Sequence, residues 1–409
     1  MITAISLKEQ QAIRTRITRD RVETLIPPLM TELGIDFWVV PSGDFNLDPV
    51  QTFLMEEDSP SSNVLVFSNC GGRFEKFINA RFLPYGEGDF YKNFVPKGED
   101  TYEALSRLIG EKKPRNIAVN TSQEFSILDG ISHTDYERVR QAAGGIPIVS
   151  AEELAMRFMQ HRTGAELENY ERSAAAARAL IRETYSRSVI TPGVTTTDDV
   201  RWFMRQRIRE MGMDYTWGPN CDLQRQGCAH PMLGGENESE VILPGDLLHI
   251  DFGISYLQTE TDMQYLCYVL KDGETCPPAG LVSGFDACRK HQQIYMDTVR
   301  PGMTGNALWR EINAKAEAAG LKSMLYSHPI GFHVHGVGAS MGRFGRMPDI
   351  SCGNYIIRNG MCFAMEQNVR VKVPEWDDQE IFIFREEDVA LVDGKIRVIG
   401  ELQPQLFVI

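Results

Sequence analysis

Acidic and histidine residues that could ligate a metal or exchange protons lie in four short segments of the second half of the chain. The first segment, His-Ile-Asp-Phe-Gly, contains Asp251 and is followed by Asp262. This odd spacing would put the two carboxylates on opposite faces of one continuous strand. Gly253 and the stretch 255–260 allow a turn, however, so two antiparallel strands could bring both carboxylates into one pocket.

The other three segments follow toward the C-terminus. A Ser-His-Pro-Ile-Gly-Phe-His-Val-His run contains His328, His333 and His335, an Ala-Met-Glu run ends at Glu366, and Glu387 precedes an aspartate after an apolar stretch. Taken singly, each has an ordinary explanation, because strand-end carboxylates are usually solvated and histidine clusters can form surface loops. The functional interpretation therefore depends on the whole set and its order.

In this order, the segments resemble the superfamily of methionine aminopeptidase, aminopeptidase P, prolidase and creatinase, which has the pita-bread fold. The aspartates are similar to two metal ligands of that family, and the histidine run resembles its Gly-His-Gly-Ile-Gly-x-x-x-His. Ala-Met-Glu resembles its Thr-Ile-Glu-Pro, and the Glu-Asp pair resembles one near its C-terminus. The resemblance covers roughly residues 160–400 and implies five metal ligands: Asp251, Asp262, His328, Glu366 and Glu387.

The same resemblance implies roles for side chains around the metals. Glu366 would also be the general base and proton shuttle, and His335 would hydrogen-bond the substrate carbonyl or its oxyanion. His230, in an Ala-His-Pro upstream of the first aspartate, would hold the side of the scissile nitrogen or the substrate backbone. Arg385 lies where prolidases carry an arginine that binds a substrate carboxylate. His333 stands where the family does not usually have a histidine, and it would be a further substrate-pocket group or a partner of a metal ligand. The alternatives are a solvated strand arginine and a plain loop histidine.

Four carboxylates and one imidazole form an oxygen-rich site, which suits Mn(II), Fe(II) or Co(II) better than a structural zinc. Without cations, the clustered carboxylates would repel one another. Two divalent ions about 3.5–4 Å apart would neutralise them, lower the pKa of a bridging water and polarise a carbonyl oxygen. We therefore expect two divalent ions, manganese before cobalt, iron or zinc, and amide hydrolysis by a metal-bridging hydroxide.

The expected reaction is cleavage of Xaa-Pro bonds in short peptides, by a dipeptidase or an aminopeptidase. Proline removes the amide hydrogen at that bond, so such a site must polarise the carbonyl and recognise the ring. Pro329, His333, Gly336 and the pair at 367–368 depart from the family pattern around the substrate. They favour, as an alternative, creatinase-like amidine hydrolysis or a metal-dependent lyase acting on a small metabolite. A silent binding module is a third hypothesis, although all five matched ligand positions are retained.

The chain is expected to fold into two domains, and the second domain holds these residues. Strand patterns at 35–40, 63–67, 116–120 and 146–150 alternate with helical stretches, which predicts an α/β domain over residues 1–155. This domain resembles the N-terminal domain of creatinase and prolidase. A long helix over 151–188 leads into an α+β pita-bread catalytic domain over 156–409. Its expected strands are 246–252, 263–270 and 381–391, and its expected helices are 280–299 and 305–319.

Composition limits the partners. Among 409 residues, 42 are Lys or Arg and 56 are Asp or Glu, and the formal charge of -14 disfavours nucleic acids and anionic membranes. We see no apolar run of about 18 residues and no signal-peptide pattern. The eight cysteines include no Cys-x-x-Cys, which is typical of a reduced cytoplasm. We expect a small peptide or small-molecule substrate and, from fold relatives, a homodimer.

Overall fold

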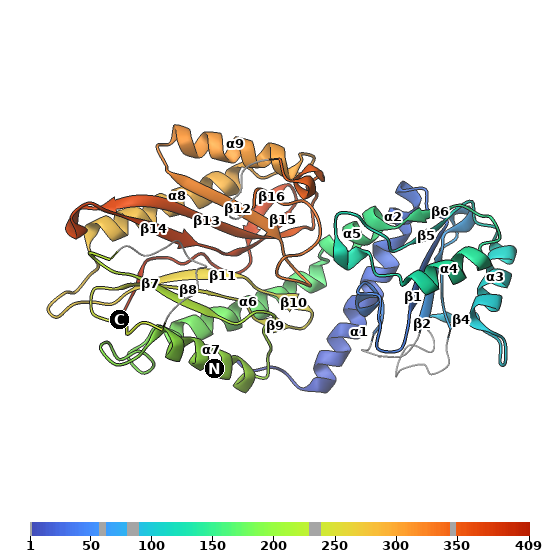
Figure 1. Cartoon of the computed structure of the whole chain (residues 1–409), viewed down its shortest axis with the longest axis horizontal. Coiled ribbons are helices and arrows are strands. Elements are labelled where there is room, and N and C mark those ends of the chain that lie inside the picture. Colours follow the sequence, from blue (N-terminus) through green and yellow to red (C-terminus); the bar gives the residue numbers. More distant parts are fainter. Residues whose placement is uncertain (1, 57–62, 80–89, 229–238, 344–348) are drawn as a thin grey trace. The chain divides into compact units, whose positions relative to one another are not determined.

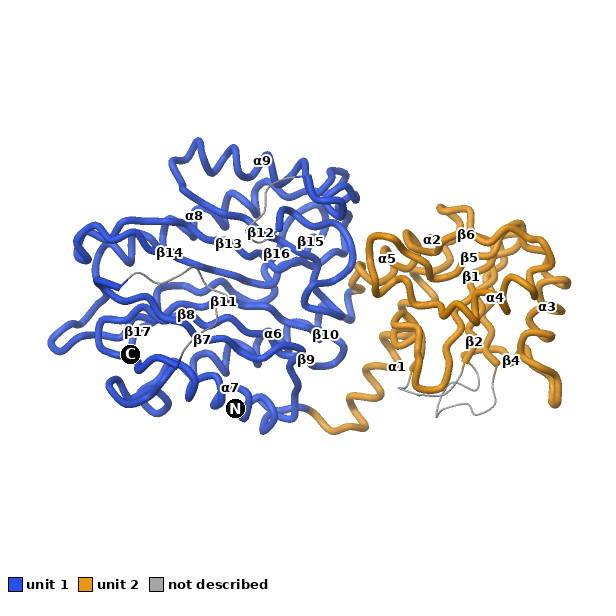
Figure 2. The backbone as a smooth tube through the Cα atoms, viewed as in Figure 1, with its two compact units in different colours: residues 1–4, 164–409 blue, residues 5–163 orange. Residues whose placement is uncertain are grey.

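The computed structural model describes residues 2–56, 63–79, 90–228, 239–343 and 349–409. The chain divides into two compact units, which Figure 2 shows in different colours. The smaller unit is Ile5–Thr163, and the larger unit is Met1–Ala4 together with Gly164–Ile409. The division falls after Thr163, where the sequence predicts a boundary after residue 155. Helix α5 (Glu152–Gln160) accordingly belongs to the smaller unit.

One mixed sheet with the strand order β4-β3-β2-β1-β5-β6 forms the smaller unit. Strands β1 and β2 are antiparallel, whereas β1, β5 and β6 are parallel. One face, with Val39, packs against α3 and α4, and the other carries Trp38, whose ring lies 6.2 Å from that of Phe158 in α5. The strands are β1 (Phe37–Ser42), β2 (Asn63–Ser68), β3 (Glu75–Ile78), β4 (Lys92–Asn93), β5 (Ile117–Val119) and β6 (Ile148–Ser150), and the other helices are α1 (Leu7–Thr24), α2 (Ile26–Glu32), α3 (Thr101–Lys112) and α4 (His133–Ala142).

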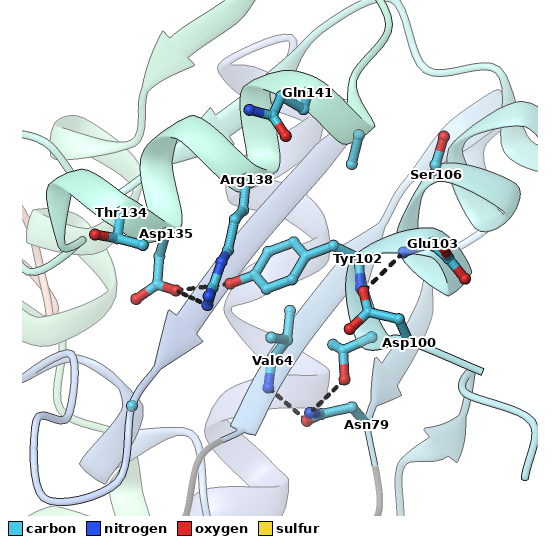
Figure 3. Close-up of a pocket in the computed structure, with 13 residues that line it drawn as sticks. Val64, Asn79, Asp100, Tyr102, Glu103, Ser106, Thr134, Asp135, Arg138 and Gln141 are labelled. Atoms are coloured by element: carbon cyan, nitrogen blue, oxygen red, sulfur yellow. Dashed lines mark hydrogen bonds and ion pairs between the residues drawn. The ribbon is translucent and has the colours of Figure 1, made fainter. Parts of the chain in front are cut away.

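A cavity of about 670 Å³ lies beside α3 and α4 in the smaller unit (Figure 3). Three of its ionisable side chains contact one another. The Tyr102 hydroxyl donates a hydrogen bond of 2.8 Å to Asp135, whose carboxylate lies 3.7 Å from Arg138. Asp100 caps α3 by accepting hydrogen bonds from two backbone N–H groups of its first turn. None of the site residues predicted from the sequence lies among the residues that line this cavity.

Two main sheets form the larger unit, beside the two-stranded sheet β10-β9, and helices cover the outer faces of the main sheets (Figure 1). The four-stranded sheet has the order β17-β11-β8-β7, and the five-stranded sheet has the order β12-β13-β15-β16 with β14 paired to β13. Helices α8 and α9 pack on the five-stranded sheet through two apolar clusters. The elements are α6 (Gly164–Thr184), α7 (Thr197–Glu210), β7 (Asn220–Gln224), β8 (Leu247–Phe252), β9 (Ser255–Tyr256), β10 (Thr259–Glu260), β11 (Met263–Tyr268), α8 (Ala279–Thr298), α9 (Gly305–Ala318), β12 (Ser323–Pro329), β13 (Cys362–Val373), β14 (Gln379–Arg385), β15 (Asp388–Val392), β16 (Lys395–Val398) and β17 (Phe407–Val408).

Helix limits follow local chemistry. Helix α7 begins with a capping box in which the side chains of Thr196 and Asp199 each accept a hydrogen bond from the other residue's backbone N–H. The predicted long helix at 151–188 is two helices, α5 and α6, that the segment 161–163 separates. Helices α1 and α2 are separated at Leu25, and Pro27 lies in the first turn of α2, where proline is tolerated.

Candidate metal centre

Five side chains that could bind a metal meet between the two sheets of the larger unit. Asp251 lies on β8, Asp262 precedes β11, His328 lies on β12, Glu366 lies on β13, and Glu386 follows β14. Their ligand atoms form overlapping groups within which all atoms are within 4.8 Å of one another: Asp251-Asp262-Glu386 and His328-Glu366-Glu386. A third group, Asp262-His328-His335, adds His335, which follows β12 in the chain.

Antiparallel pairing of β8 and β11 brings the two aspartates together. Asp251 pairs with Gln264 in this ladder, so Asp262 lies just beyond the end of the paired strands. The turn between the strands needs a glycine, because a Cβ on Gly253 would lie 2.0 Å from the carbonyl oxygen of Thr261. The structure thus has the antiparallel arrangement that a turn between the two aspartates allows.

The register of β13 with the next strands decides which glutamate joins the cluster. Gln367 pairs with Arg385 and Ala364 pairs with Asp388 in one antiparallel register, which puts Glu386 directly opposite Glu366. Because side chains alternate along a strand, Glu386 shares the cavity face with Glu366.

The sequence assigns the fifth ligand position to Glu387, and here the structure corrects it by one residue. The Glu387 carboxylate lies on the opposite face of the strand, where it accepts hydrogen bonds from the Tyr265 hydroxyl at 3.0 Å and the Gln403 backbone N–H at 2.8 Å. A shift of one residue along a strand moves a side chain to the other face. Glu386 therefore takes the place predicted for Glu387.

Arg385 is also turned away from the cavity, for the same reason. Its side chain is 1% exposed, its guanidinium lies 4.2 Å from the ring centroid of Phe285 in α8, and it donates a hydrogen bond of 2.6 Å to the carbonyl oxygen of Gln403. A side chain buried between sheet and helix cannot contact a substrate in the cavity. The predicted contact between Arg385 and a substrate carboxylate is therefore wrong.

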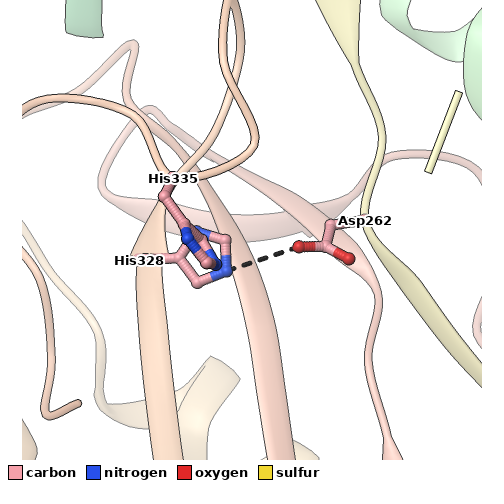
Figure 4. Close-up of side chains that lie close together, drawn as sticks. All are labelled: Asp262, His328 and His335. Carbon is pink, nitrogen blue, oxygen red and sulfur yellow. Dashed lines mark ion pairs between the residues drawn. The ribbon is translucent and has the colours of Figure 1, made fainter. Parts of the chain in front are cut away.

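The described histidines of the 328–335 run lie beside the carboxylates or on the wall of the cavity around them. The Nε2 atom of His328 is 3.5 Å from an Asp262 carboxylate oxygen, and its ring lies edge-on to that of His335 with centroids 4.5 Å apart (Figure 4). His333 and His335 both line the cavity. His230 lies outside the described residues.

The clustered carboxylates have higher pKa values than ordinary acidic groups. Burial raises the pKa of Asp251, Asp262 and Glu386 well above the usual carboxyl range, and the neighbouring carboxylates raise it further. Burial also raises the pKa of Glu366, which His328 partly offsets. Cations would remove this repulsion and keep the carboxylates ionised.

Atoms at the centre of the cluster have no hydrogen-bond partner among the described residues: Oδ1 of Asp251, Nε2 of His328 and Oε1 of Glu386. Buried polar atoms are rarely left in this state, and a metal ion is one of the groups that satisfies them. Carboxylate oxygens with an imidazole nitrogen form a donor set for divalent manganese, iron or cobalt. The residues present therefore fit the expected metal ions.

The surrounding cavity has a volume of about 580 Å³, and the sequence motifs alone missed several of its lining residues. His249, Gln264, Tyr326 and Phe384 all line it. Each lies two residues from a member of the cluster on the same strand or its direct extension, so the two side chains share a face. Strand periodicity was therefore a usable signal for these four, whereas Trp217, which also lines the cavity, comes from a loop with no such signal.

Comparisons with known proteins agree with this geometry. The model of metallopeptidase family M24 matches residues 168–394. Among solved structures, the chain is similar to an X-Pro aminopeptidase from Thermotoga maritima MSB8, with 17% identity and a TM-score of 0.69 over 93% of this chain and 100% of that chain. It is also similar to an Xaa-Pro dipeptidase from Bacillus anthracis, with 15% identity and a TM-score of 0.61 over 97% and 100%.

A dipeptidase from Pyrococcus horikoshii OT3 has 17% identity and a TM-score of 0.63, covering 95% of this chain and 100% of that chain. A comparison with curated proteins found no match. At these identities the structural likeness shows the fold, and it confirms the predicted pita-bread fold with its N-terminal α/β domain. No helix in the described part of the chain combines the length and apolarity needed to cross a bilayer.

Proposed function

Because the chain belongs to metallopeptidase family M24, we propose that the cluster in the larger unit binds two divalent metal ions and hydrolyses amide bonds in short peptides. The observation that carries this proposal is the convergence of five ligand groups from five separate segments. The residues that would hold the ions are Asp251, Asp262, His328, Glu366 and Glu386. Manganese is the first choice for this oxygen-rich set, followed by cobalt, iron and zinc. When bound, such ions activate a water and polarise a carbonyl oxygen.

The chain's own residues would position the peptide and move the proton. Glu366, on the cavity wall, would take a proton from the attacking water and deliver it to the leaving nitrogen. His335 would donate a hydrogen bond to the carbonyl oxygen as negative charge develops there. The aromatic side chains of Trp217 and Phe384 would pack against the substrate and exclude water.

For the substrate, we propose a peptide with proline at its second position. The place of Arg385 favours an aminopeptidase over a dipeptidase. A dipeptide carries its carboxylate next to the scissile bond, and Arg385 is buried away from the cavity and cannot bind it. In a longer peptide the carboxylate lies further away, so no partner for it is needed at this point.

An assay with four peptides tests this function. The protein is stripped with a chelator, reloaded with Mn(II), and given Gly-Pro, Ala-Pro, Ala-Pro-Ala and Ala-Ala-Ala. We expect metal-dependent cleavage of Ala-Pro-Ala, slower cleavage of the dipeptides, and little cleavage of Ala-Ala-Ala. If the reloaded protein cleaves none of these peptides, the peptidase proposal fails.

A matched pair of variants tests the ligand assignment. Glu386→Gln and Glu387→Gln make the same chemical change one residue apart on opposite faces of the strand. We expect Glu386→Gln to lose metal and activity, measured by elemental analysis and peptide cleavage. Glu387→Gln should keep its metal, because its carboxylate bonds Tyr265 and Gln403 outside the cluster. The reverse result would restore the ligand position that the sequence predicts.

One observation favours a second function on the same site. Aromatic rings of Trp217, Tyr326 and Phe384 line the cavity, whereas no Lys or Arg is among its described lining residues. Aromatic faces attract cationic groups, so the cavity also suits a small cationic metabolite, as in creatinase-like amidine hydrolysis or a metal-dependent lyase. Turnover of creatine or of a betaine or sulfonium compound, without peptide cleavage, would select this alternative. The homodimer and the cytoplasmic location stay predictions.

A further inference from the structure

Gln264 connects the two sheets of the larger unit at the metal centre. Its amide nitrogen donates a hydrogen bond of 2.5 Å to Oε2 of Glu386, and its amide oxygen lies 2.9 Å from Nε2 of His249. Its backbone also exchanges hydrogen bonds of 3.2 and 3.4 Å with that of Glu386. All three residues line the cavity, and the Gln264 side chain is buried.

The chemistry of the three groups fixes the direction of both hydrogen bonds. An ionised carboxylate only accepts, so the amide NH₂ of Gln264 must face Glu386. The amide oxygen then faces His249, and an amide oxygen also only accepts. His249 must therefore donate from Nε2. A neutral imidazole with its hydrogen on Nε2 has a bare, accepting Nδ1.

Glu386 and His249 each keep one side-chain atom that Gln264 does not bind. At Glu386, Gln264 holds Oε2, whereas Oε1 lies 3.8 Å from Nε2 of His328 and has no hydrogen-bond partner among the described residues. At His249, Nδ1 likewise has no hydrogen-bond partner there, and the nearest acidic oxygen is on Asp222, 3.9 Å away.

We propose that Gln264 is a positioning residue that orients Glu386 so that Oε1 faces the metals and holds His249 in the Nε2–H tautomer, with Nδ1 accepting an N–H group of the substrate. The proposal rests on the proposed metal-dependent function. An acceptor on the cavity wall beside the Asp222 carboxylate suits the amino end of a peptide or another N–H donor. Groups that orient a metal ligand typically contribute 10–100-fold to metal affinity.

The experiment uses the full chain and two matched variants. Gln264→Met removes both side-chain hydrogen bonds at similar size but leaves the backbone bonds to Glu386. Gln292→Met makes the same change at a buried glutamine on α8, outside the cavity, whose amide has no partner among the described residues. Nitrogen-15 NMR reports the His249 tautomer with and without Zn(II), with signals assigned by their loss in His249→Phe. Calorimetry with Mn(II) reports metal affinity.

We expect the wild-type protein to show His249 with hydrogen on Nε2 and an unprotonated Nδ1. Gln264→Met should lose this fixed tautomer and bind Mn(II) about 10–100-fold more weakly, whereas Gln292→Met should match the wild type in both measurements. A purely structural cross-link would leave the tautomer and the affinity of Gln264→Met unchanged.

Two results would overturn the inference: hydrogen on Nδ1 of His249 in the wild-type protein, or, when the wild-type protein binds Mn(II), equal Mn(II) affinity in Gln264→Met and Gln292→Met. Failure of the proposed function looks different. If the wild-type protein binds no divalent ion but shows an Nε2–H tautomer that Gln264→Met loses, the metal-dependent function falls and the link from Gln264 to His249 is supported.

Discussion

Two cavities of the molecule differ in whether their charged side chains are paired. One lies beside α3 and α4 in the smaller unit, and the other surrounds the candidate metal centre in the larger unit. In the smaller unit, the polar groups satisfy one another: Tyr102 bonds Asp135, which lies beside Arg138 (Figure 3). In the larger unit, buried carboxylates such as Asp262 and Glu386 face one another, and several of their central atoms have no hydrogen-bond partner among the described residues. Internal pairing makes the first cavity stable without a ligand. The second cavity has a charge distribution that cations complete.

The strongest test of this comparison is a change at Glu366, the proposed proton carrier of the larger unit. Glu366→Gln keeps the size of the side chain but cannot take up a proton. We expect kcat on an Xaa-Pro peptide to fall about 10²–10⁴-fold, the range for loss of general acid–base catalysis. Metal content measured on the same sample separates lost chemistry from a lost ligand. A kcat within tenfold of the wild type would exclude Glu366 as the proton carrier.

The next largest effect should be stabilisation of one unit by metal. A ligand that binds only the folded state stabilises it by about 4 kcal/mol at a free concentration of 1,000 times Kd. Mn(II) should therefore raise the urea midpoint of the larger unit and leave that of the smaller unit unchanged. Hydrogen–deuterium exchange can follow peptides of the two units separately. Equal stabilisation of both units would contradict the assignment of the metal to the larger unit.

A fall in pH should change the unfolding free energies of the two units in opposite directions through two buried groups, Asp48 and His291. Burial raises the pKa of Asp48 in the smaller unit from 3.8 to about 6. The folded state therefore binds more protons in this window, and the stability due to Asp48 is lost as pH rises through it. Burial lowers the pKa of His291 in the larger unit from 6.5 to about 4. Its folded state binds fewer protons, so the stability due to His291 is lost as pH falls through that window.

Asp48 contributes at most about 3 kcal/mol and His291 at most about 3 to 4 kcal/mol, since one pKa unit corresponds to about 1.4 kcal/mol. Asp48→Asn should remove the contribution of Asp48 to the decline of smaller-unit stability between about pH 4 and 6, and His291→Leu should remove the contribution of His291 to the acid sensitivity of the larger unit between about pH 4 and 6.5. The readout is the slope of the unfolding free energy against pH in each unit, because both substitutions also change absolute stability. Unchanged slopes would show that these groups do not titrate as their burial indicates.

These cavities also show which parts of the site a sequence can predict. The aspartate pair, the histidine run and Glu366 carry enough local pattern to predict a metal centre and its fold. The sequence pattern does not show which of Arg385 and Glu386 points into the cavity, because the run Ile-Phe-Ile-Phe before them is apolar at every position. A strand buried on both faces shows no alternation between apolar and polar residues. Only pairing with β13 decides which face meets the cavity.

The smallest effect expected is at the cavity of the smaller unit, and it tests whether that cavity is independent of the metal centre. Tyr102→Phe removes the hydrogen bond to Asp135 and should destabilise the smaller unit by about 1 kcal/mol, the usual net value of such a bond. Asp135 keeps a second bond, from the Ser132 hydroxyl at 2.6 Å, which limits the loss. Urea unfolding measures the change. Because the lost bond lies wholly within the smaller unit, Mn(II) affinity and peptide cleavage should be unaltered, and a change in either would show that the two cavities are coupled.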